Sequence, residues 1–264
     1  MHDNVFDRYQ PHDSLLHRLD PRVKILVTIL FILSNILLPD GAWLAFGLGW
    51  CFILLGNLLA EVGVGYTLRR SLLALMFSLA TVTTIFSIPG NALTTLHLGN
   101  ISLVATDAGV LRFVSIMLRA WLSVQGAVLL VVTTRFPDLI HALEHLFMPK
   151  ILVTIIAFLY RYLFVLTDEV MRMMRARQSR SASIPNVHGG GSLPWRVHVS
   201  GGMVGQLFLR SYERSDRIYN AMLARGYTGQ IRTLFSHVML RKDWFFMFLA
   251  CLSLVALQFI GRIH

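Results

Sequence analysis

The feature that most constrains this chain is a series of apolar blocks, each about as long as a membrane is thick. Four blocks lie at about 23–38, 42–60, 71–88 and 107–132, and another lies at about 244–260. A helix needs about 20 mostly apolar residues to cross the hydrocarbon core of a bilayer. Only 14% of the residues are charged, whereas a soluble domain carries about a quarter. The blocks predict an all-α, polytopic membrane protein with about five transmembrane helices.

The basic residues are distributed unevenly, and this predicts the orientation of the chain. No Lys or Arg lies between residues 71 and 111, whereas fifteen lie from Arg135 to Lys242. Lys and Arg concentrate in the cytoplasmic loops of membrane proteins. We therefore predict a multi-pass protein of the cell (inner) membrane with a cytoplasmic N-terminus, an outward loop at 89–106 and an outward C-terminus. Nucleic acid is not an expected partner, because the basic stretch interrupts membrane spans.

One more segment, ILVTIIAFLYRYLFVL at 151–166, is also apolar enough to cross. If it crossed, residues 167–242 would lie outside with their twelve Lys and Arg, against the usual charge bias. We therefore expect it to lie against other helices or to insert half-way. The chain then divides into an N-terminal membrane domain at 1–135, a cytoplasmic module at 136–242 and a C-terminal transmembrane helix at 243–264.

The cytoplasmic module is predicted to hold a short helix at 138–146 and two long helices at about 151–181 and 195–225. The glycine-rich stretch IPNVHGGGSLP between the long helices is a flexible connector. The two long helices can therefore form an antiparallel or crossed pair. Charged residues of both signs lie along them, and these either face solvent or bridge the pair. They are Glu169, Arg172, Glu213, Arg214, Asp216 and Arg217.

Both long helices close on an Ala-Arg pair. The first ends MRMMRARQSR, with Ala176 and Arg177, and the second ends IYNAMLARGYTG, with Ala224 and Arg225. Gly226 suits the left-handed position that follows a helix, and an Arg in the last turn complements the negative end of the helix dipole. The two pairs are explained either by this local chemistry and chance or by a role that both share.

Four segments together resemble a known family. They are SLLHRLDPRVK, FPDLIHALEHL, AFLYRYLFVLTDEVMRMMRARQSRS and LFLRSYERSDRIYNAMLARGYTGQIRTL, and the resemblance covers nearly the whole chain. They look like the transmembrane T component of energy-coupling factor (ECF) transporters, in the CbiQ group associated with cobalt uptake. The resemblance implies a non-catalytic helical scaffold. It would join two cytoplasmic ABC ATPase subunits to a substrate-binding membrane S component, CbiM-like for cobalt, within membrane lipid.

In that family, Ala-Arg-Gly-like motifs at the ends of the coupling helices dock into grooves on the ATPases. Carried over by position, the motifs are Ala176-Arg177-Gln178 and Ala224-Arg225-Gly226. Gln178 departs from the glycine that is common there, so a helix that continues through it would aim Arg177 differently. No G-x-x-x-x-G-K-[ST] motif occurs in the sequence, and we expect no cofactor in this chain, with ATP bound by the partner subunits.

The sequence HALEH places His141 and His145 on one helix face, with Glu144 between them, and such a pair could hold a transition metal. We favour an interfacial amphipathic helix, because nothing nearby supplies a third or fourth ligand. A second cluster at the N-terminus, formed by His2, Asp3, His12 and Asp13, is interpreted in the same way. No metal site is therefore predicted.

Arg112 and Arg119 lie seven residues apart on one face of the fourth span. A charge at bilayer depth costs about 2.5–3.5 kcal/mol on insertion scales, so Arg119 should face a partner group. No Asp or Glu is expected to pair with it from within a predicted span. We expect structural packing against backbone carbonyls of a neighbouring helix, or contact with a partner subunit. Cys51 and Cys251 lie in apolar runs and are interpreted as small hydrophobic residues.

Two other functions compete with the coupling scaffold. An intramembrane metal-dependent enzyme would use His141, Glu144 and His145, but would need further acids or histidines facing the membrane interior. A conventional ABC permease half would show one short coupling loop rather than a helical module. Within the scaffold interpretation, cobalt is favoured as substrate by the resemblance alone, and nickel or a vitamin stays open. The start MHDNVFDRYQPHDS has no apolar region, so we expect no cleavable signal peptide.

Overall fold

The computed structural model describes residues 9–10, 13–98, 101–146, 148–180, 192–229 and 239–263. By its contacts the chain divides into two compact units. The bundle unit comprises Asp7–Leu146 and Ser236–His264, and the long-helix unit comprises Met1–Phe6 and Phe147–Phe235.

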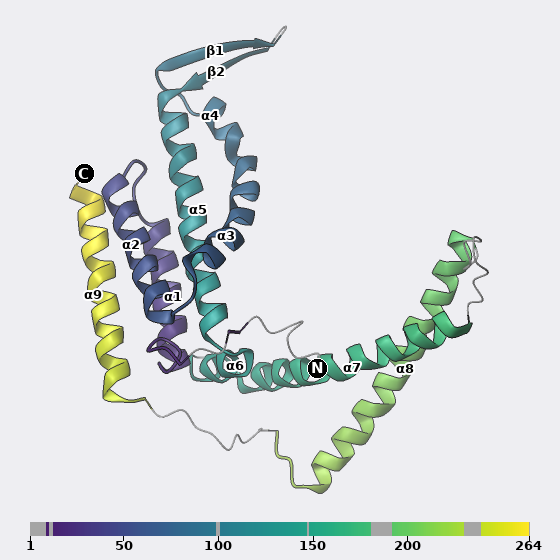
Figure 1. The fold of residues 1–264 in the computed structure, drawn as a ribbon. Helices are drawn as coiled ribbons and strands as arrows, with labels where there is room; N and C mark the ends of the chain where they lie inside the picture. Colours follow the sequence, from purple (N-terminus) through teal and green to yellow (C-terminus); the bar gives the residue numbers. More distant parts are fainter. Residues whose placement is uncertain are drawn as a thin grey trace. The chain divides into compact units, whose positions relative to one another are not determined.

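The bundle unit is built around one central helix, α5 (Asp107–Thr133), which packs against α1, α2, α3 and α4 (Figure 1). The last helix, α9, packs against α1 and α2. The other elements of this unit are α1 (Pro21–Ile36), α2 (Trp43–Ala60), α3 (Val64–Ser78), the 3-10 turn η1 (Leu79–Thr83), α4 (Thr84–Ser87), β1 (Ala92–Leu98), β2 (Ile101–Thr106), α6 (Phe136–His145) and α9 (Arg241–Ile263).

The core of the bundle lies between α1, α2, α5 and α9, where Phe31, Ile53 and Leu122 are buried together. The outer surface of these helices is also apolar, as Phe248 of α9 illustrates with 67% of its surface exposed. A helix that is apolar on all sides is typical of a membrane-spanning helix whose outer face contacts lipid. Close packing is possible at the start of α5 because residue 109 is glycine. A Cβ there would stand 2.5 Å from the backbone oxygen of Ile85.

Among the described residues, five helical stretches are long and apolar enough to cross a membrane. They are Trp43–Ala60, Val64–Ser87, Asp107–Thr133, Lys150–Arg180 and Arg241–Arg262. The all-α, polytopic class is therefore confirmed, and the number agrees with the prediction. Four of the five coincide with predicted spans and the remaining one contains 151–166, whereas the predicted span 23–38 corresponds to the shorter helix α1.

The first predicted span is short because of how its ends are capped. Asp20 caps the start of α1, since its side chain accepts the backbone N–H of Arg22, and Pro21 is the first helical residue. The helix ends at Ile36, three residues before Pro39. Its 16 residues extend about 24 Å at 1.5 Å per residue, against about 30 Å of hydrocarbon.

The third span begins earlier than predicted. The predicted block begins at 71, but α3 begins at Val64 and already contains Arg69 and Arg70. The Arg70 guanidinium lies 4.6 Å from the centre of the Tyr66 ring, one helical turn away, which favours the helical form. The stretch then tightens into η1 and ends in the single turn α4.

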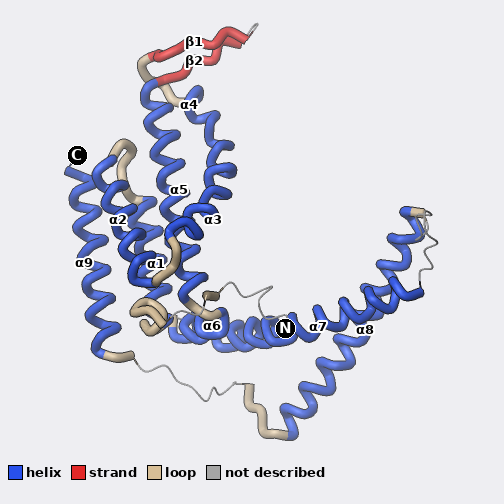
Figure 2. Tube along the Cα trace, viewed as in Figure 1, coloured by secondary structure: helices blue, strands red, loops and turns tan. Residues whose placement is uncertain are grey.

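The predicted loop at 89–106 contains regular structure. Strands β1 and β2 pair antiparallel into a hairpin, from Leu98 opposite Ile101 to Ala92 opposite Thr106 (Figure 2). The alternation of apolar and polar residues in ALTTLHL and ISLVAT is short, and Gly99 and Asn100 lie outside the described part of the chain. The Thr106 hydroxyl accepts the N–H of Gly109 at 3.2 Å, so β2 leads directly into a capped α5.

The long-helix unit consists of α7 (Lys150–Arg180) and α8 (Leu193–Ala224), each within two residues of its predicted bounds. The glycine-rich connector at 181–191 lies outside the described residues. The short helix α6 groups with the bundle unit, although we predicted it inside the cytoplasmic module. It packs against α1 and buries Ile140 and Ala142.

Candidate functional site

Glu169 marks the point at which α7 and α8 cross. It is only 8% exposed, it accepts a hydrogen bond from Arg210 of α8, and it lies 3.6 Å from Arg172 of its own helix. Further along α7, Arg177 Nη1 lies 3.5 Å from Ser200 Oγ. The later residue of α7, Arg177, thus contacts the earlier residue of α8, Ser200. The two helices therefore run antiparallel where they cross (Figure 1). Of the mixed-sign residues, Glu169 thus joins the two helices, through Arg210, which was not singled out from the sequence.

Arg177 lies in the last turn of α7 and is half-buried beside Ser200. Its neighbours Ala176 and Gln178 are exposed. The helix continues through Gln178 to Arg180, as the replacement of the expected glycine suggested. Arg177 therefore projects from the side of a helix and not from its end.

Arg225 is different, because α8 stops directly before it. The Tyr227 N–H donates to the Met222 carbonyl at 3.0 Å, and the Gly226 N–H donates to the Leu223 carbonyl at 2.9 Å. Gly226 has φ +80°, the left-handed conformation predicted for this glycine, and these two bonds form a Schellman cap. The Arg225 side chain is exposed and has no hydrogen-bond or ion-pair partner within the described part of the chain. The cap fixes the backbone from which this guanidinium projects.

The two Arg residues lie far apart on the pair of helices. Arg177 contacts Ser200, which precedes Arg225 by 25 residues along α8. At 1.5 Å per residue this corresponds to roughly 37 Å. One compact protein groove cannot receive both motifs, so they present two separate contact points.

An open groove of about 630 Å³ lies between the first half of α7 and the second half of α8. Aromatic side chains line it, among them Phe158, Tyr162, Phe208, Tyr212 and Tyr219. Phe208 and Tyr212 are 67% and 68% exposed, and no residue of α8 is buried. Large exposed apolar surfaces of this kind mark contact with a membrane or with another protein.

Comparison with known proteins identifies the family. The model described as CbiQ, cobalt transport protein, matches residues 12–237. The chain belongs to the CbiQ family. The predicted resemblance is therefore confirmed, over a region that includes both Ala-Arg pairs.

Relatives of this CbiQ protein include energy-coupling factor transporter transmembrane proteins. That of Acidaminococcus fermentans is 31% identical over 236 residues, which are 86% of this chain and 84% of the relative. That of Clostridium kluyveri is 28% identical and covers 99% of this chain and 97% of the relative. An uncharacterised protein of Methanocaldococcus jannaschii is 27% identical over 99% of this chain and 88% of its own length.

The HALEH stretch of the CbiQ protein forms part of α6. The His141 and His145 rings stack with 5.2 Å between their centres, and Glu144 lies between them in sequence. Burial lowers the pKa of His145, and the positive charge of Arg22 adds to this effect. Among the described residues, no group of three or more His, Cys, Asp or Glu side chains could hold a metal ion. Of the N-terminal cluster, His2, Asp3 and His12 lie outside the described residues.

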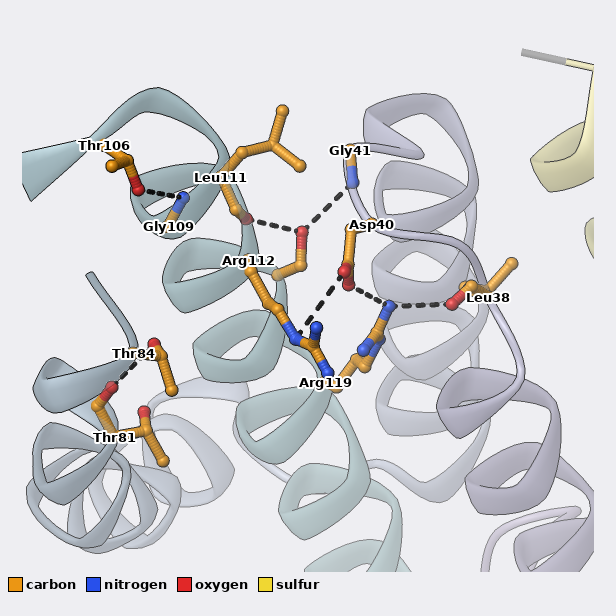
Figure 3. Close-up of polar contacts among 11 residues, drawn as sticks. Leu38, Asp40, Gly41, Thr81, Thr84, Thr106, Gly109, Leu111, Arg112 and Arg119 are labelled. Carbon is orange, nitrogen blue, oxygen red and sulfur yellow. Dashed lines mark hydrogen bonds and ion pairs between the residues drawn. The ribbon is translucent and has the colours of Figure 1, made fainter. Parts of the chain in front are cut away.

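Arg119 has an acidic partner that the sequence did not reveal. Its Nη2 donates to Asp40 Oδ1 and to the Leu38 carbonyl oxygen, each at 2.7 Å (Figure 3). Arg112 Nε lies 3.9 Å from the other oxygen of Asp40. We expected backbone carbonyls of a neighbouring helix, and the carbonyl that receives Arg119 belongs to Leu38, in the turn that follows α1. We considered only acids within spans and therefore overlooked Asp40, which lies in the same turn.

Sequence reasoning also missed a buried polar cluster at the opposite end of α1, formed by Asp20, Lys24 and Asp243. The signal that could have revealed part of it is the tripeptide Asp20-Pro21-Arg22. An Asp directly before Pro and a helix is a strong helix start. Nothing local in the sequence connects Lys24 with Asp243, which lies 219 positions further along the chain.

Proposed function

We propose that this CbiQ-family protein is the energy-coupling subunit of an ECF-type ABC importer. It transmits motion from two cytoplasmic ATPase subunits to a membrane S component that binds the substrate. The observation that carries this proposal is Arg225. The Schellman cap holds its backbone at the end of α8, and the guanidinium is exposed without a partner in the described part of the chain.

An exposed Arg on a fixed helix end suits docking into a carboxylate-lined groove. The guanidinium is planar and binds a carboxylate through two parallel hydrogen bonds, which Lys cannot reproduce. Ala224 directly before Arg225 adds no bulk beside the guanidinium. Arg177 supplies the second contact, and its separation of roughly 37 Å along α8 supports one contact for each of two ATPase subunits.

The charge distribution supports a cytoplasmic position for both Arg motifs. The stretch from Arg135 to Lys242 carries fifteen Lys and Arg, which favours the inner side of the membrane. The N-terminus is then also cytoplasmic. In this arrangement the apolar segment 151–166 of α7 does not cross the bilayer, and its exposed Ile151, Ile155 and Leu159 contact lipid or another subunit. ATP binds to the partner subunits, and this chain carries no cofactor.

The S component is the expected partner for the aromatic groove between α7 and α8, because that surface is exposed and apolar and no residue of α8 is itself buried. Cobalt is the proposed substrate, supported by the description of the matching family. Nickel or a vitamin would require only a different S component. An intramembrane enzyme at His141, Glu144 and His145 is the weaker alternative, since the described residues offer these imidazoles no third metal ligand.

Co-purification tests the docking role. The chain is co-expressed with genes for the proposed ATPase and S-component partners, and bound ATPase is measured per molecule of this chain. Arg225→Ala removes the docking group, and Arg225→Lys keeps the charge but loses the planar geometry. Arg217→Ala is the matched control, because Arg217 is an exposed Arg of the same helix.

We expect Arg225→Ala to lose ATPase and uptake, with a cost of about 2–5 kcal/mol for an interfacial charge of this kind. Arg225→Lys should recover little, and Arg217→Ala should behave as wild type. Wild-type amounts of ATPase on Arg225→Ala would refute the docking role. Uptake of radiolabelled cobalt and nickel by cells with and without this gene separates the two metals.

A further inference from the structure

An apolar cavity of about 320 Å³ lies within the bundle unit, lined by side chains of α1, α2, α5 and α9. Two of its lining residues, Phe31 and Ile53, belong to the core of the bundle. Two others, Leu55 of α2 and Leu249 of α9, are 58% and 50% exposed. The cavity therefore opens onto the outer surface of the bundle, where apolar side chains surround it.

The length of this cavity fits one acyl chain of a membrane lipid. Its lining on α1 extends from Val23 to Phe31, which corresponds to about 12 Å at 1.5 Å per residue. One leaflet provides about half of the roughly 30 Å of hydrocarbon in a bilayer. An acyl chain that enters beside Val23 and runs along α1 thus stays within one leaflet.

A polar cavity of about 520 Å³ adjoins the apolar one, at the end of the bundle where α1 and α9 begin and α5 ends. Leu19, Lys24 and Thr133 line both cavities. Three basic and three acidic side chains line the polar cavity, namely Arg18, Lys24, Arg135, Asp20, Asp138 and Asp243. An apolar cavity joined to a charged one suits an amphiphile, and the balance of charges favours a zwitterionic headgroup.

Asp20 presents an acceptor that the protein leaves without a donor. Its Oδ1 accepts the N–H of Arg22 at 2.9 Å and lies 3.9 Å from Arg22 Nε. Its Oδ2 is buried and has no hydrogen-bond partner within the described part of the chain, and the residue is 6% exposed. A buried carboxylate oxygen without a hydrogen bond is costly. The position of Oδ2 in the lining of a polar cavity therefore indicates that a donor from outside the chain completes it.

Two groups beside Asp20 are suited to donate to a phosphate. Lys24 Nζ donates to the carbonyls of His17 at 3.1 Å and Thr133 at 3.0 Å, which uses two of the three N–H groups of an ammonium. Thr134 is 3% exposed, and its hydroxyl has no partner among the residues that the structure describes. The remaining N–H of Lys24 and the hydroxyl of Thr134 are the matching donors for phosphate oxygens.

We propose that the two cavities together bind one molecule of phosphatidylethanolamine. Its ammonium group donates to Asp20 Oδ2, its phosphate accepts from Lys24 and Thr134, and one acyl chain occupies the apolar cavity. Phosphatidylcholine carries the same charges, but its quaternary ammonium has no N–H and leaves Asp20 without a donor. Phosphatidylglycerol brings no cation to the acids of the cavity. This site is independent of the proposed coupling function.

Native mass spectrometry of the full chain in detergent tests the site. Phosphatidylethanolamine, phosphatidylcholine and phosphatidylglycerol with identical acyl chains are added separately, and the dissociation constant of the first bound lipid is measured for each. Glycerophosphoethanolamine, which has the same headgroup without acyl chains, is then added as a competitor at the same concentration as the lipid. This separates a lipid site from a site for a soluble phosphate compound.

Three variants each remove one feature of the site. Asp20→Asn replaces the charged acceptor, and asparagine also caps helices well, so the start of α1 is retained. Thr134→Val removes the hydroxyl at nearly equal volume, and Ala250→Trp fills the apolar cavity that Ala250 lines. The matched controls are Asp107→Asn, at an exposed acid in the first turn of α5, and Ala256→Trp, at an exposed residue of α9 outside the cavity.

We expect the wild-type chain to bind phosphatidylethanolamine at least about tenfold more tightly than phosphatidylcholine, because a hydrogen bond to a buried charge is worth this factor. Asp20→Asn should lose the preference while its affinity for phosphatidylcholine stays unchanged. Thr134→Val should weaken binding of phosphatidylethanolamine about 2- to 10-fold. Ala250→Trp should abolish binding, both controls should behave as wild type, and glycerophosphoethanolamine should not compete.

Equal affinity of the wild-type chain for phosphatidylethanolamine and phosphatidylcholine would overturn the proposal and would mean that water completes Asp20. A preference for phosphatidylglycerol would overturn it as well, and so would wild-type binding by Ala250→Trp or displacement by glycerophosphoethanolamine. If Asp20→Asn does not fold, the headgroup preference of the wild-type chain and the contrast between Ala250→Trp and Ala256→Trp decide the question.

Discussion

Replacing Gly226 by Ala is a clean perturbation, because the added methyl group would touch nothing. A Cβ at this position has no atom of the structure within 4 Å, and the backbone has φ +80°. The effect of the substitution is therefore confined to backbone conformation. An L-residue in the left-handed region costs about 1–2 kcal/mol. Because 1.4 kcal/mol changes an equilibrium constant tenfold, this cost raises the population of the open cap about 5- to 30-fold.

Hydrogen exchange measures this opening directly. The amides of residue 226 and Tyr227 donate to the Leu223 and Met222 carbonyls, and they exchange with solvent only when the cap opens. Peptides that cover 222–229 should exchange about 5- to 30-fold faster in Gly226→Ala, in line with that backbone cost. Peptides around Arg210, in the middle of α8, should be unchanged.

A series of substitutions at position 226 extends the test, because residues differ in how well they tolerate a positive φ. Asn tolerates the left-handed region better than Ala, and a β-branched residue tolerates it worst. Exchange should therefore rise in the order Gly, Asn, Ala, Val at position 226. If the proposed docking is right, the amount of ATPase retained should fall in the same order. Wild-type exchange rates in the Ala and Val variants would show that the cap does not set the backbone that carries Arg225.

Two further predictions concern the packing of the bundle. Gly109→Ala should destabilise it by about 1–3 kcal/mol, because the new Cβ meets the Ile85 carbonyl oxygen at 2.5 Å. Gly47→Ala, with nothing within 4 Å, should be neutral or stabilise α2 by up to about 1 kcal/mol. Equal thermal unfolding temperatures in detergent would contradict this difference. Arg119→Met and Asp40→Asn should show a coupling energy of about 1 kcal/mol in a double-mutant cycle, because both side chains are partly exposed, at 20% and 34%. Strictly additive effects would argue against the pair.

Local sequence signals predicted how the two long helices behave near their Ala-Arg pairs, because the physics involved is local. Gly226 was recognised as the residue after a helix, and the structure gives it a positive φ with both bonds of a Schellman cap. The departure at Gln178 was likewise a local signal, and α7 continues through it. Long apolar stretches predicted the class of the protein for the same reason, since membrane thickness sets their length.

Pairings between distant residues could not be read from the sequence. Arg119 meets Asp40, 79 positions earlier, only because α5 packs beside the turn between α1 and α2. The prediction considered acids within spans and therefore overlooked an acid in a turn. The hairpin of β1 and β2 was missed for a related reason. Its strands are 7 and 6 residues long, and it is the pairing with each other that defines them.

The distribution of glycine along α8 indicates how this helix could bear a force. Gly201, Gly202 and Gly205 lie in its first half, and a Cβ on any of them would meet nothing within 4 Å. Glycine in a helix interior costs about 1 kcal/mol relative to alanine, and here no close neighbour requires it. From Gln206 to Ala224 the helix contains no glycine. This uninterrupted stretch connects Arg210, at the crossing with α7, to the residue before Arg225. If the proposed docking is right, a force applied at Arg225 is therefore transmitted through the glycine-free residues 206–224 to the Glu169–Arg210 contact. Bending of α8 is expected on the far side of that contact, at Gly201, Gly202 and Gly205.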